Sequence, residues 1–193
     1  MSTLPHPQDR RYTIEEFKEM DFGDLTAELI DGQIVIAQAY PSDQHGLITA
    51  NLGYHLRLAL DASRNVECRP MSASGVYIRG FDHGLPNDNA FGPDLTVRCL
   101  NEDGTWSPSV IVEVLSKSDL PNEMAAKLRA YKAVPTIQDI LYLYQDKFYV
   151  LHHRRRDGQW QVGVDLSGPD VEIIIERWNI RTQLEDVYKR VFN

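Results

Sequence analysis

An apolar run at residues 110–115 constrains the fold more than any other segment, because a single charged residue interrupts it. A strand that is apolar on both faces is typical of the buried centre of a sheet. The interrupting residue is Glu113. A carboxylate left unpaired in a low-dielectric interior is costly, so this position predicts a positive charge or a bound cation beside the strand.

A second carboxylate, Asp94, opens the predicted strand at residues 94–99. If this strand and the one at residues 109–115 are neighbours, Asp94 and Glu113 can meet, and the carbonyl of Val114 can add a third oxygen. Ligands that are all oxygen favour Mg²⁺ or Mn²⁺ over zinc. The alternative is that Asp94 caps a turn while Glu113 pairs with a buried arginine or lysine.

Lys127 lies in a predicted helix at residues 121–132, on one face with Glu123 and Tyr131. A lysine beside a metal can orient or deprotonate the attacking water, or stabilise charge that develops on a phosphoryl group. The alternative is a solvated helical ion pair with Glu123. Lys117 is the rival lysine, nearer in sequence to the carboxylates but placed in a loop.

Three further features have both a functional and a structural interpretation. Glu28, in a strand beside an Asp-Gly turn, is either a third acidic ligand or an outward polar residue. His45, in the first turn of a long helix, either contacts phosphate or water or has no special role. The basic run at residues 154–156 can contact phosphate, but a charged strand edge that discourages sheet association is favoured.

The pattern predicts one domain over residues 1–193, with residues 1–11 as an N-terminal tail. Leu47, Ile48 and residues 52, 56, 59 and 60 recur at helical spacing and predict one buried helix face. Residues 80–92 are expected to form a loop. Helices are predicted at residues 13–17, 43–62, 121–132 and 182–190, and strands at 27–30, 33–37, 66–70, 74–79, 94–99, 109–115, 139–145, 148–153, 159–164 and 171–175. This order predicts an α/β (α+β) fold, with a mixed central sheet flanked by helices and antiparallel additions.

Composition limits the cellular setting and the partners. The net charge is −8, and nine acidic against three basic residues give residues 1–50 a charge of −6. This acidity argues mildly against an open nucleic-acid surface, although bound Mg²⁺ offsets part of it. There is no apolar leader and no apolar stretch near the ~20 residues that span a bilayer. Cys68 and Cys99 show no metal or redox spacing and fit a reducing compartment, so we expect a cytoplasmic protein without membrane partners.

Several segments together resemble a known family. Residues 12–17, 27–33, 92–95, 112–116 and 127–131 follow in the order found in a bacterial family labelled putative restriction endonuclease, of unknown biological role, within the PD-(D/E)xK nuclease superfamily. The resemblance covers roughly residues 12–150. It implies a restriction-endonuclease-like core with a Mg²⁺ site.

By that analogy Asp94 takes the aspartate of the motif and Glu113 its second carboxylate. The superfamily lysine normally follows two residues later, where this chain has Leu115, and the family displaces it to the next helix, at Lys127. Glu28 and His45 match the family's early glutamate and its histidine. The chain departs from the family pattern at residues 116–118, at residue 123 and at residues 142–146.

The sequence therefore supports two hypotheses. The first is a Mg²⁺- or Mn²⁺-dependent endonuclease that hydrolyses DNA and acts as a homodimer, because paired cuts on a duplex suit two-fold symmetry. The second is an interaction module that keeps the nuclease fold but is catalytically silent. We favour the first, although the acidic balance, the lack of an obvious DNA-reading element and the displaced lysine support the second.

Overall fold

The computed structural model describes residues 10–36, 41–63, 67–117 and 119–192, and the chain divides into two compact units. Each unit has its own antiparallel or mixed sheet. The first unit comprises Met1–Tyr40, Gly75–Gly92 and Leu120–Val134, and the second comprises Pro41–Ser74, Pro93–Asp119 and Pro135–Asn193.

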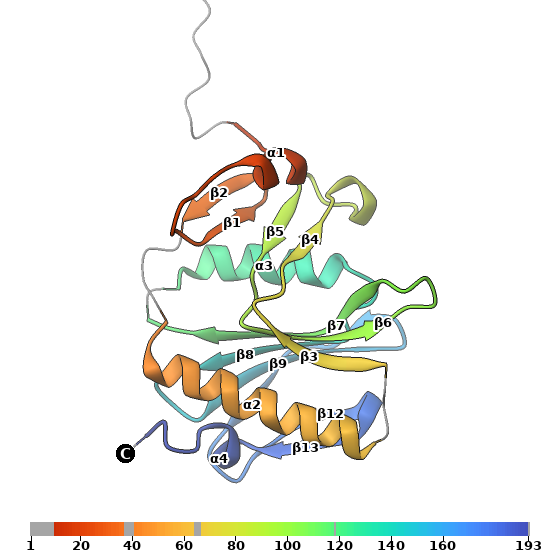
Figure 1. Ribbon diagram of the computed structural model, residues 1–193. Helices are drawn as coiled ribbons and strands as arrows, with labels where there is room; N and C mark the ends of the chain where they lie inside the picture. Colours follow the sequence, from red (N-terminus) through yellow and green to blue (C-terminus); the bar gives the residue numbers. More distant parts are fainter. Residues whose placement is uncertain (1–9, 37–40, 64–66, 118, 193) are drawn as a thin grey trace, which may run out of the picture. The chain divides into compact units, whose positions relative to one another are not determined.

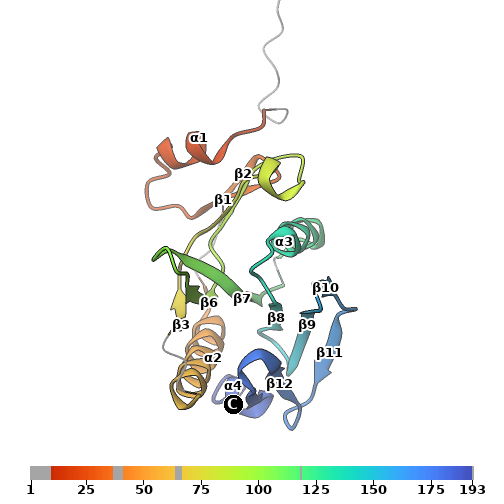
Figure 2. The same cartoon turned by 90° about the vertical axis from the view of Figure 1, so that its right-hand side faces the viewer.

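The first unit contains a four-stranded antiparallel sheet in the order β2-β1-β5-β4. Its elements are α1 (Ile14–Glu19), β1 (Ala27–Ile30), β2 (Gln33–Ile36), β4 (Val76–Ile78), β5 (Asn89–Phe91) and α3 (Pro121–Ala133). Asp31 and Gly32 both have positive φ, so they form the tight hairpin turn that the sequence predicts. Figures 1 and 2 show α1 and α3 on opposite sides of this sheet.

The loop predicted at residues 80–92 is wrong in part, because it contains β5 and a short 3₁₀ turn at Phe81–His83. Ala90 of β5 pairs with Leu29 of β1 on one side and with Tyr77 of β4 on the other. A three-residue strand is too short to show an alternating pattern, and the glycines around it resemble those of a loop.

The second unit contains a seven-stranded mixed sheet in the order β10-β9-β8-β7-β6-β3, with β11 also paired to β9. Its strands are β3 (Cys68–Ser72), β6 (Leu95–Leu100), β7 (Trp106–Leu115), β8 (Asp139–Tyr144), β9 (Tyr149–Arg156), β10 (Gln159–Trp160) and β11 (Val164–Ser167). Only β7 and β8 are parallel in this sheet. Residues 110–115 are all buried, which confirms the predicted central strand.

Helix α2 (Asp43–Ala62) covers one face of that sheet. Ile48, Leu52, Leu56 and Leu60 follow at intervals of one helical turn and are buried in the core. Leu47 is 38% exposed, so its predicted burial is wrong; it lies one residue off the buried stripe. In the part of the chain that the structure describes, neither α2 nor any other helix is long and apolar enough to cross a membrane.

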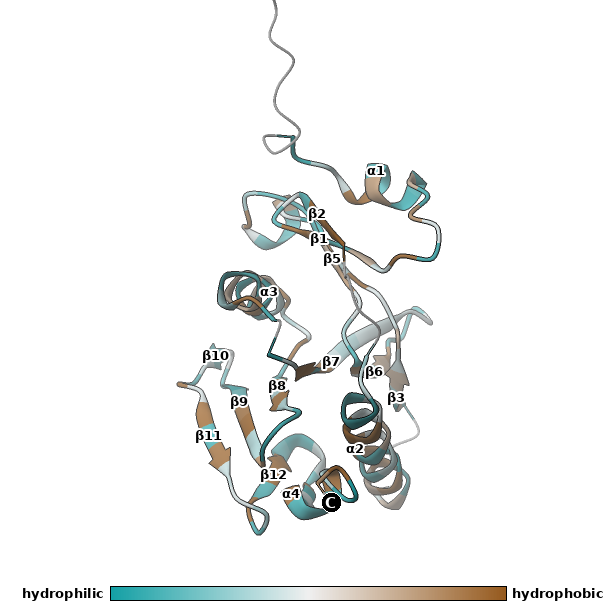
Figure 3. Ribbon diagram, turned by 90° about the vertical axis from the view of Figure 1, so that its left-hand side faces the viewer, coloured by the Kyte–Doolittle hydropathy of each residue, from teal (hydrophilic) through white to brown (hydrophobic). Residues whose placement is uncertain are grey.

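The C-terminal segment completes the same core with β12 (Glu172–Ile175), β13 (Ile180–Gln183) and the short α4 (Leu184–Val187). Figure 3 shows hydrophobic residues along β9, β11 and β12. The helix predicted at residues 182–190 is therefore shorter and starts later. Ile180 and Thr182 are buried at the two-residue spacing of a strand, and β12 pairs with them.

The two cysteines are not isolated, contrary to the prediction. Antiparallel pairing of β3 with β6 places Cys68 opposite Cys99, and the two form a disulfide. Residues on neighbouring strands are brought together by register, which the spacing of cysteines along the chain does not reveal. The cysteines therefore give no support to a reducing compartment.

Candidate functional site

The carboxylate of Asp94 is fixed by two hydrogen bonds at the start of β6. The backbone N–H of Val114 donates to Oδ2 at 2.6 Å, and Nε2 of His45 donates to Oδ1 at 3.0 Å. The side chains of His45 and Asp94 are only 15% and 22% exposed. Both oxygens thus point in defined directions, and each keeps a lone pair for a further partner.

Glu113 lies on the strand next to Asp94. Leu95 pairs with Val112, so Asp94 and Glu113 are the next residues along on two antiparallel strands. Side chains at such opposed positions share one face of the sheet, with Cβ atoms about 5 Å apart. Glu113 is 7% exposed, so its carboxylate is buried within a strand, and strands β6 and β7 are neighbours as the sequence predicts.

His45 lies among three carboxylates. The hydrogen bond to Asp94 raises the pKa of His45, burial opposes this, and the charges of Asp94, Asp119 and Glu113 raise the pKa further. His45 reaches this position because Ser42 caps α2 and accepts a hydrogen bond from the His45 N–H, which fixes the first turn. The carboxylates around His45 therefore favour the protonated form of its ring.

Asp119 is not among the residues that the sequence singles out. Its Oδ2 accepts hydrogen bonds from the N–H and the hydroxyl of Ser116, at 2.6 and 2.7 Å, which turns the segment after β7. A serine followed three residues later by an aspartate is common in turns and carries no functional signal by itself. Its nearness to His45 follows only from the fold.

Two of the predicted metal ligands, Asp94 and Glu113, lie at neighbouring positions in the second unit, directly before β6 and within β7. Among the residues that the structure describes, no group of three or more His, Cys, Asp or Glu side chains is arranged to hold one. A metal-binding role for Asp94, Glu113 and the backbone carbonyl of Val114 therefore stays a prediction. Mg²⁺ is commonly held by one or two carboxylates, with water and substrate supplying its other ligands.

The first unit holds the other two candidate residues as a pair. Nζ of Lys127 lies 3.0 Å from Oε1 of Glu28, with side-chain exposures of 15% and 19%. The same oxygen accepts the N–H of Gly92 at 3.0 Å, and the ammonium lies 5.6 Å from the ring centroid of Phe91. Glu28 is therefore not an outward polar residue of an alternating strand.

Lys117 differs sharply from Lys127. Its side chain is 87% exposed and its ammonium lies 3.8 Å from Asp146. An exposed pair at this distance fixes the amine weakly. The structure thus favours Lys127 as the positioned lysine. The family resemblance also pointed to Lys127.

The predicted residues thus form two groups: His45, Asp94, Glu113 and Val114 in the second unit, and Glu28 with Lys127 in the first. A comparison of the sequence with protein families identifies the family of this chain. A family model, Uma2, described as "Putative restriction endonuclease", matches residues 14–179. The chain belongs to the Uma2 family.

Uma2 membership confirms the resemblance drawn from the short sequence segments. A solved structure also matches: a crystal structure of a putative nuclease belonging to DUF820 from Anabaena variabilis, with a TM-score of 0.73 and 16% sequence identity. The match covers 93% of this chain and 99% of that one. It confirms the mixed α+β fold of this Uma2 protein. A comparison with curated proteins finds no similar sequence.

Proposed function

We propose that this protein hydrolyses phosphodiester bonds of DNA with the help of Mg²⁺ or Mn²⁺. The observation that carries the proposal is the Asp94 carboxylate, held by His45 and the Val114 N–H beside the buried Glu113. Two adjacent carboxylates repel each other, and a bound divalent cation relieves that repulsion. Family membership supports a nuclease as the class of activity.

The residues present fit such a cation. Asp94, Glu113 and the carbonyl of Val114 would hold it, and all are hard oxygen donors. The three carboxylate charges that act on His45 indicate where a cation is favoured. When bound, Mg²⁺ supplies positive charge to the phosphate oxygens and lowers the pKa of nearby water.

The protein side chains have separate roles in this proposal. His45 holds Oδ1 of Asp94 and so fixes the orientation of that carboxylate. Lys127 supplies a positive charge that orients the attacking water or stabilises the charge on the phosphoryl group. Glu28 holds the Lys127 ammonium in a single position through its 3.0 Å contact.

One observation favours the second candidate function, a catalytically silent interaction module. The Lys127 ammonium is paired with Glu28, and the chain carries a net charge of −8. Both weaken attraction to a polyanion. The same cleavage experiment separates the two functions.

The experiment measures cleavage of supercoiled, linear, branched and single-stranded DNA with Mg²⁺, with Mn²⁺ and with a chelator. Asp94→Asn is compared with Asp61→Asn, which makes the same change in the exposed Arg57–Asp61 pair of α2. The proposal predicts metal-dependent cleavage that Asp94→Asn abolishes and Asp61→Asn leaves unchanged. Cleavage that persists in Asp94→Asn, or no cleavage of any substrate by the wild type, rejects it.

The proposal includes a homodimer, since paired cuts on a duplex suit two-fold symmetry. The large sheet also ends in strand β3, and proteins commonly cover such an edge strand. Sedimentation at several concentrations measures the mass directly. A monomer at all concentrations, with and without DNA, contradicts this part of the proposal.

A further inference from the structure

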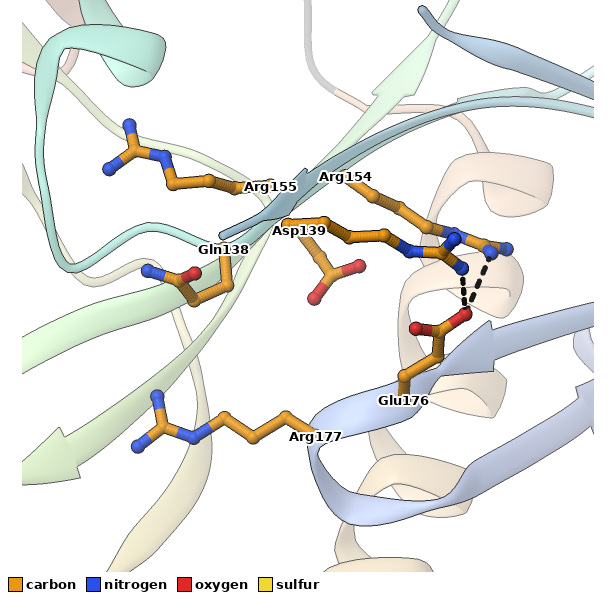
Figure 4. Close-up of a pocket in the computed structure, with 7 residues that line it drawn as sticks. Gln138, Asp139, Arg154, Arg155, Glu176 and Arg177 are labelled. Atoms are coloured by element: carbon orange, nitrogen blue, oxygen red, sulfur yellow. Dashed lines mark hydrogen bonds and ion pairs between the residues drawn. The ribbon is translucent and has the colours of Figure 1, made fainter. Parts of the chain in front are cut away.

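A polar cavity lies within the second unit, at the amino end of β8. It has a volume of about 290 Å³. Figure 4 shows side chains from β8, from β9 and from the turn after β12 directed around it. The residues that line it are Gln138, Asp139, Arg154, Arg155, Arg156, Glu176 and Arg177.

The lining is basic although the whole chain is acidic. Four arginines and two carboxylates give the cavity a formal charge of +2, in a chain of −8. Glu176 is shared, because it pairs with Arg156 and lies 3.6 Å from Arg154 (Figure 4). One carboxylate thus faces two guanidinium groups, which leaves positive charge available to an anion.

Arg177 contributes a charge that no carboxylate neutralises among the residues the structure describes. Its Nη1 donates to the hydroxyl of Ser109 at 3.2 Å, and its guanidinium carbon lies 5.5 Å from the ring centroid of Trp178. Both contacts orient the group, and neither removes its charge. A guanidinium keeps several N–H donors, arranged in a plane that matches two oxygens of an oxyanion.

Arg154 is held in the cavity wall by a buried relay. Its Nε donates to Nδ1 of His152 at 3.2 Å, and Nε2 of His152 lies 2.7 Å from Oδ1 of Asp139. Because Nδ1 accepts a hydrogen bond, the ring is neutral and its proton is on Nε2, which donates to Asp139. Burial lowers the pKa of His152, which agrees with a neutral ring. The carboxylate of Asp139 thus accepts a hydrogen bond from His152.

Arg155 forms part of the opposite side of the cavity. Its Nη1 donates to the carbonyl of Pro135 at 2.9 Å, and its guanidinium carbon lies 4.7 Å from the ring centroid of Trp160. Burial lowers the pKa of the Arg155 guanidinium, which means that its charge is partly desolvated. A partly desolvated cation interacts more strongly with an anion than a fully hydrated one does.

The cavity is separate from the Asp94 position in the same unit. Val110 pairs with Asp139, whereas Glu113 pairs with Tyr142 three residues further along. Because side chains alternate along a strand, Asp139 and Glu113 lie on opposite faces of the sheet. A phosphate group held by the arginines is therefore not the one held beside Asp94.

We propose that the cavity lined by Arg154, Arg155, Arg156 and Arg177 is a binding site for a phosphate group. Its volume lies at the lower end of the range for ligand pockets and is sufficient for a phosphate group. The phosphate comes either from a nucleic-acid strand or from a free phosphate ion. The site does not depend on the proposed hydrolysis, since its residues take no part in that reaction.

Calorimetric titration with inorganic phosphate, in metal-free buffer of low ionic strength, tests the site. Arg177→Gln removes the charge without a carboxylate partner and weakens binding about tenfold. Glu176→Gln removes the competing carboxylate and tightens binding severalfold. Arg57→Gln, in an exposed ion pair on α2, makes the same charge change elsewhere and leaves binding unchanged. A gain of affinity in Glu176→Gln cannot come from a damaged fold.

The proposal is overturned if the wild type gives no saturable heat, or if Arg57→Gln loses as much affinity as Arg177→Gln. It is also overturned if Glu176→Gln fails to bind more tightly. Repeating the titration with a short single-stranded oligonucleotide and a chelator identifies the source of the phosphate. If the oligonucleotide competes with phosphate and Arg177→Gln removes that competition, the site is supported and is assigned to a nucleic-acid backbone. Binding of phosphate without competition supports the site and assigns it to the free ion.

Discussion

Nε2 of His45 lies 3.0 Å from Oδ1 of Asp94, which joins the first turn of α2 to the start of β6. The Val114 N–H holds the other oxygen of the same carboxylate at 2.6 Å. Two contacts from different elements leave Asp94 with one orientation. In the proposed nuclease this orientation directs the carboxylate toward the cation shared with Glu113.

Replacing His45 with alanine removes one of these two contacts. We expect the rate of DNA cleavage to fall about tenfold to a hundredfold, the usual effect of losing a residue that orients a ligand. Plasmid cleavage with Mn²⁺ measures this rate. His55→Ala, also in α2, is the matched control because the ring of His55 contacts Tyr54 and not Asp94. Equal losses in the two variants contradict a positioning role for His45.

Lys127 and Lys117 give opposite predictions. Lys127→Ala removes an ammonium that Glu28 holds at 3.0 Å, and we expect cleavage to fall about a hundredfold or more. Lys117→Ala removes an 87% exposed side chain, and we expect the rate to stay the same. Single-turnover cleavage measures both. Loss of activity in Lys117→Ala alone would assign the catalytic lysine to the loop.

The α2 packing gives a stability prediction. Leu52 is fully buried in the core of the second unit, so Leu52→Ala lowers the free energy of unfolding by about 2–5 kcal/mol. Leu58, on the same helix, is 49% exposed, and Leu58→Ala changes stability by only about 0.5 kcal/mol or less. Urea denaturation of both variants measures the difference. Similar values would mean that the buried face of α2 is assigned wrongly.

Long elements with a clear period were predictable from the sequence. The apolar residues 110–115 predicted the buried central strand. Ser42 and the apolar stripe from Ile48 to Leu60 predicted where α2 begins and how far it extends. These signals are local, because apolar residues recur at a fixed spacing along the chain. β5 was not predictable, because three residues show no period and its pairing with β1 and β4 is set by tertiary contacts.

The candidate site was predictable through its residue types and through the family resemblance, but its contacts were not. Asp94 and Glu113 stand out because carboxylates are rare in apolar strands. The alternative for Lys127 was an ion pair within its own helix, whereas its observed partner Glu28 is 99 residues away in sequence. Asp119 and the Cys68–Cys99 pair depend on turn geometry and strand register in the same way.

His152, in the buried relay between Arg154 and Asp139, predicts that the free energy of unfolding decreases at acid pH. Burial lowers the pKa of His152 below its ordinary value of 6.5, so the unfolded chain takes up a proton that the folded protein excludes. The contribution of His152 to stability is complete above that pH and is lost as the pH falls below it. His152→Gln keeps a donor for Asp139 and an acceptor for Arg154 but does not titrate.

Unfolding free energies at about pH 7.5 and about pH 5 measure this effect. We expect the loss between the two values to be smaller in His152→Gln than in the wild type. His83→Gln, which replaces a histidine of the first unit, leaves the loss unchanged. An equal loss of unfolding free energy in the wild type and His152→Gln would mean that His152 does not cause the loss of stability at acid pH.

Binding of Mn²⁺, followed by the electron paramagnetic resonance signal of the free ion, tests most directly whether Asp94 and Glu113 hold a cation. Our expectation is a saturable Mn²⁺ site in the wild type and in Lys127→Ala, and a loss of Mn²⁺ affinity of more than about tenfold in Asp94→Asn and in Glu113→Gln. Equal Mn²⁺ affinity in the wild type and both carboxylate variants, or no saturable binding in the wild type, contradicts it.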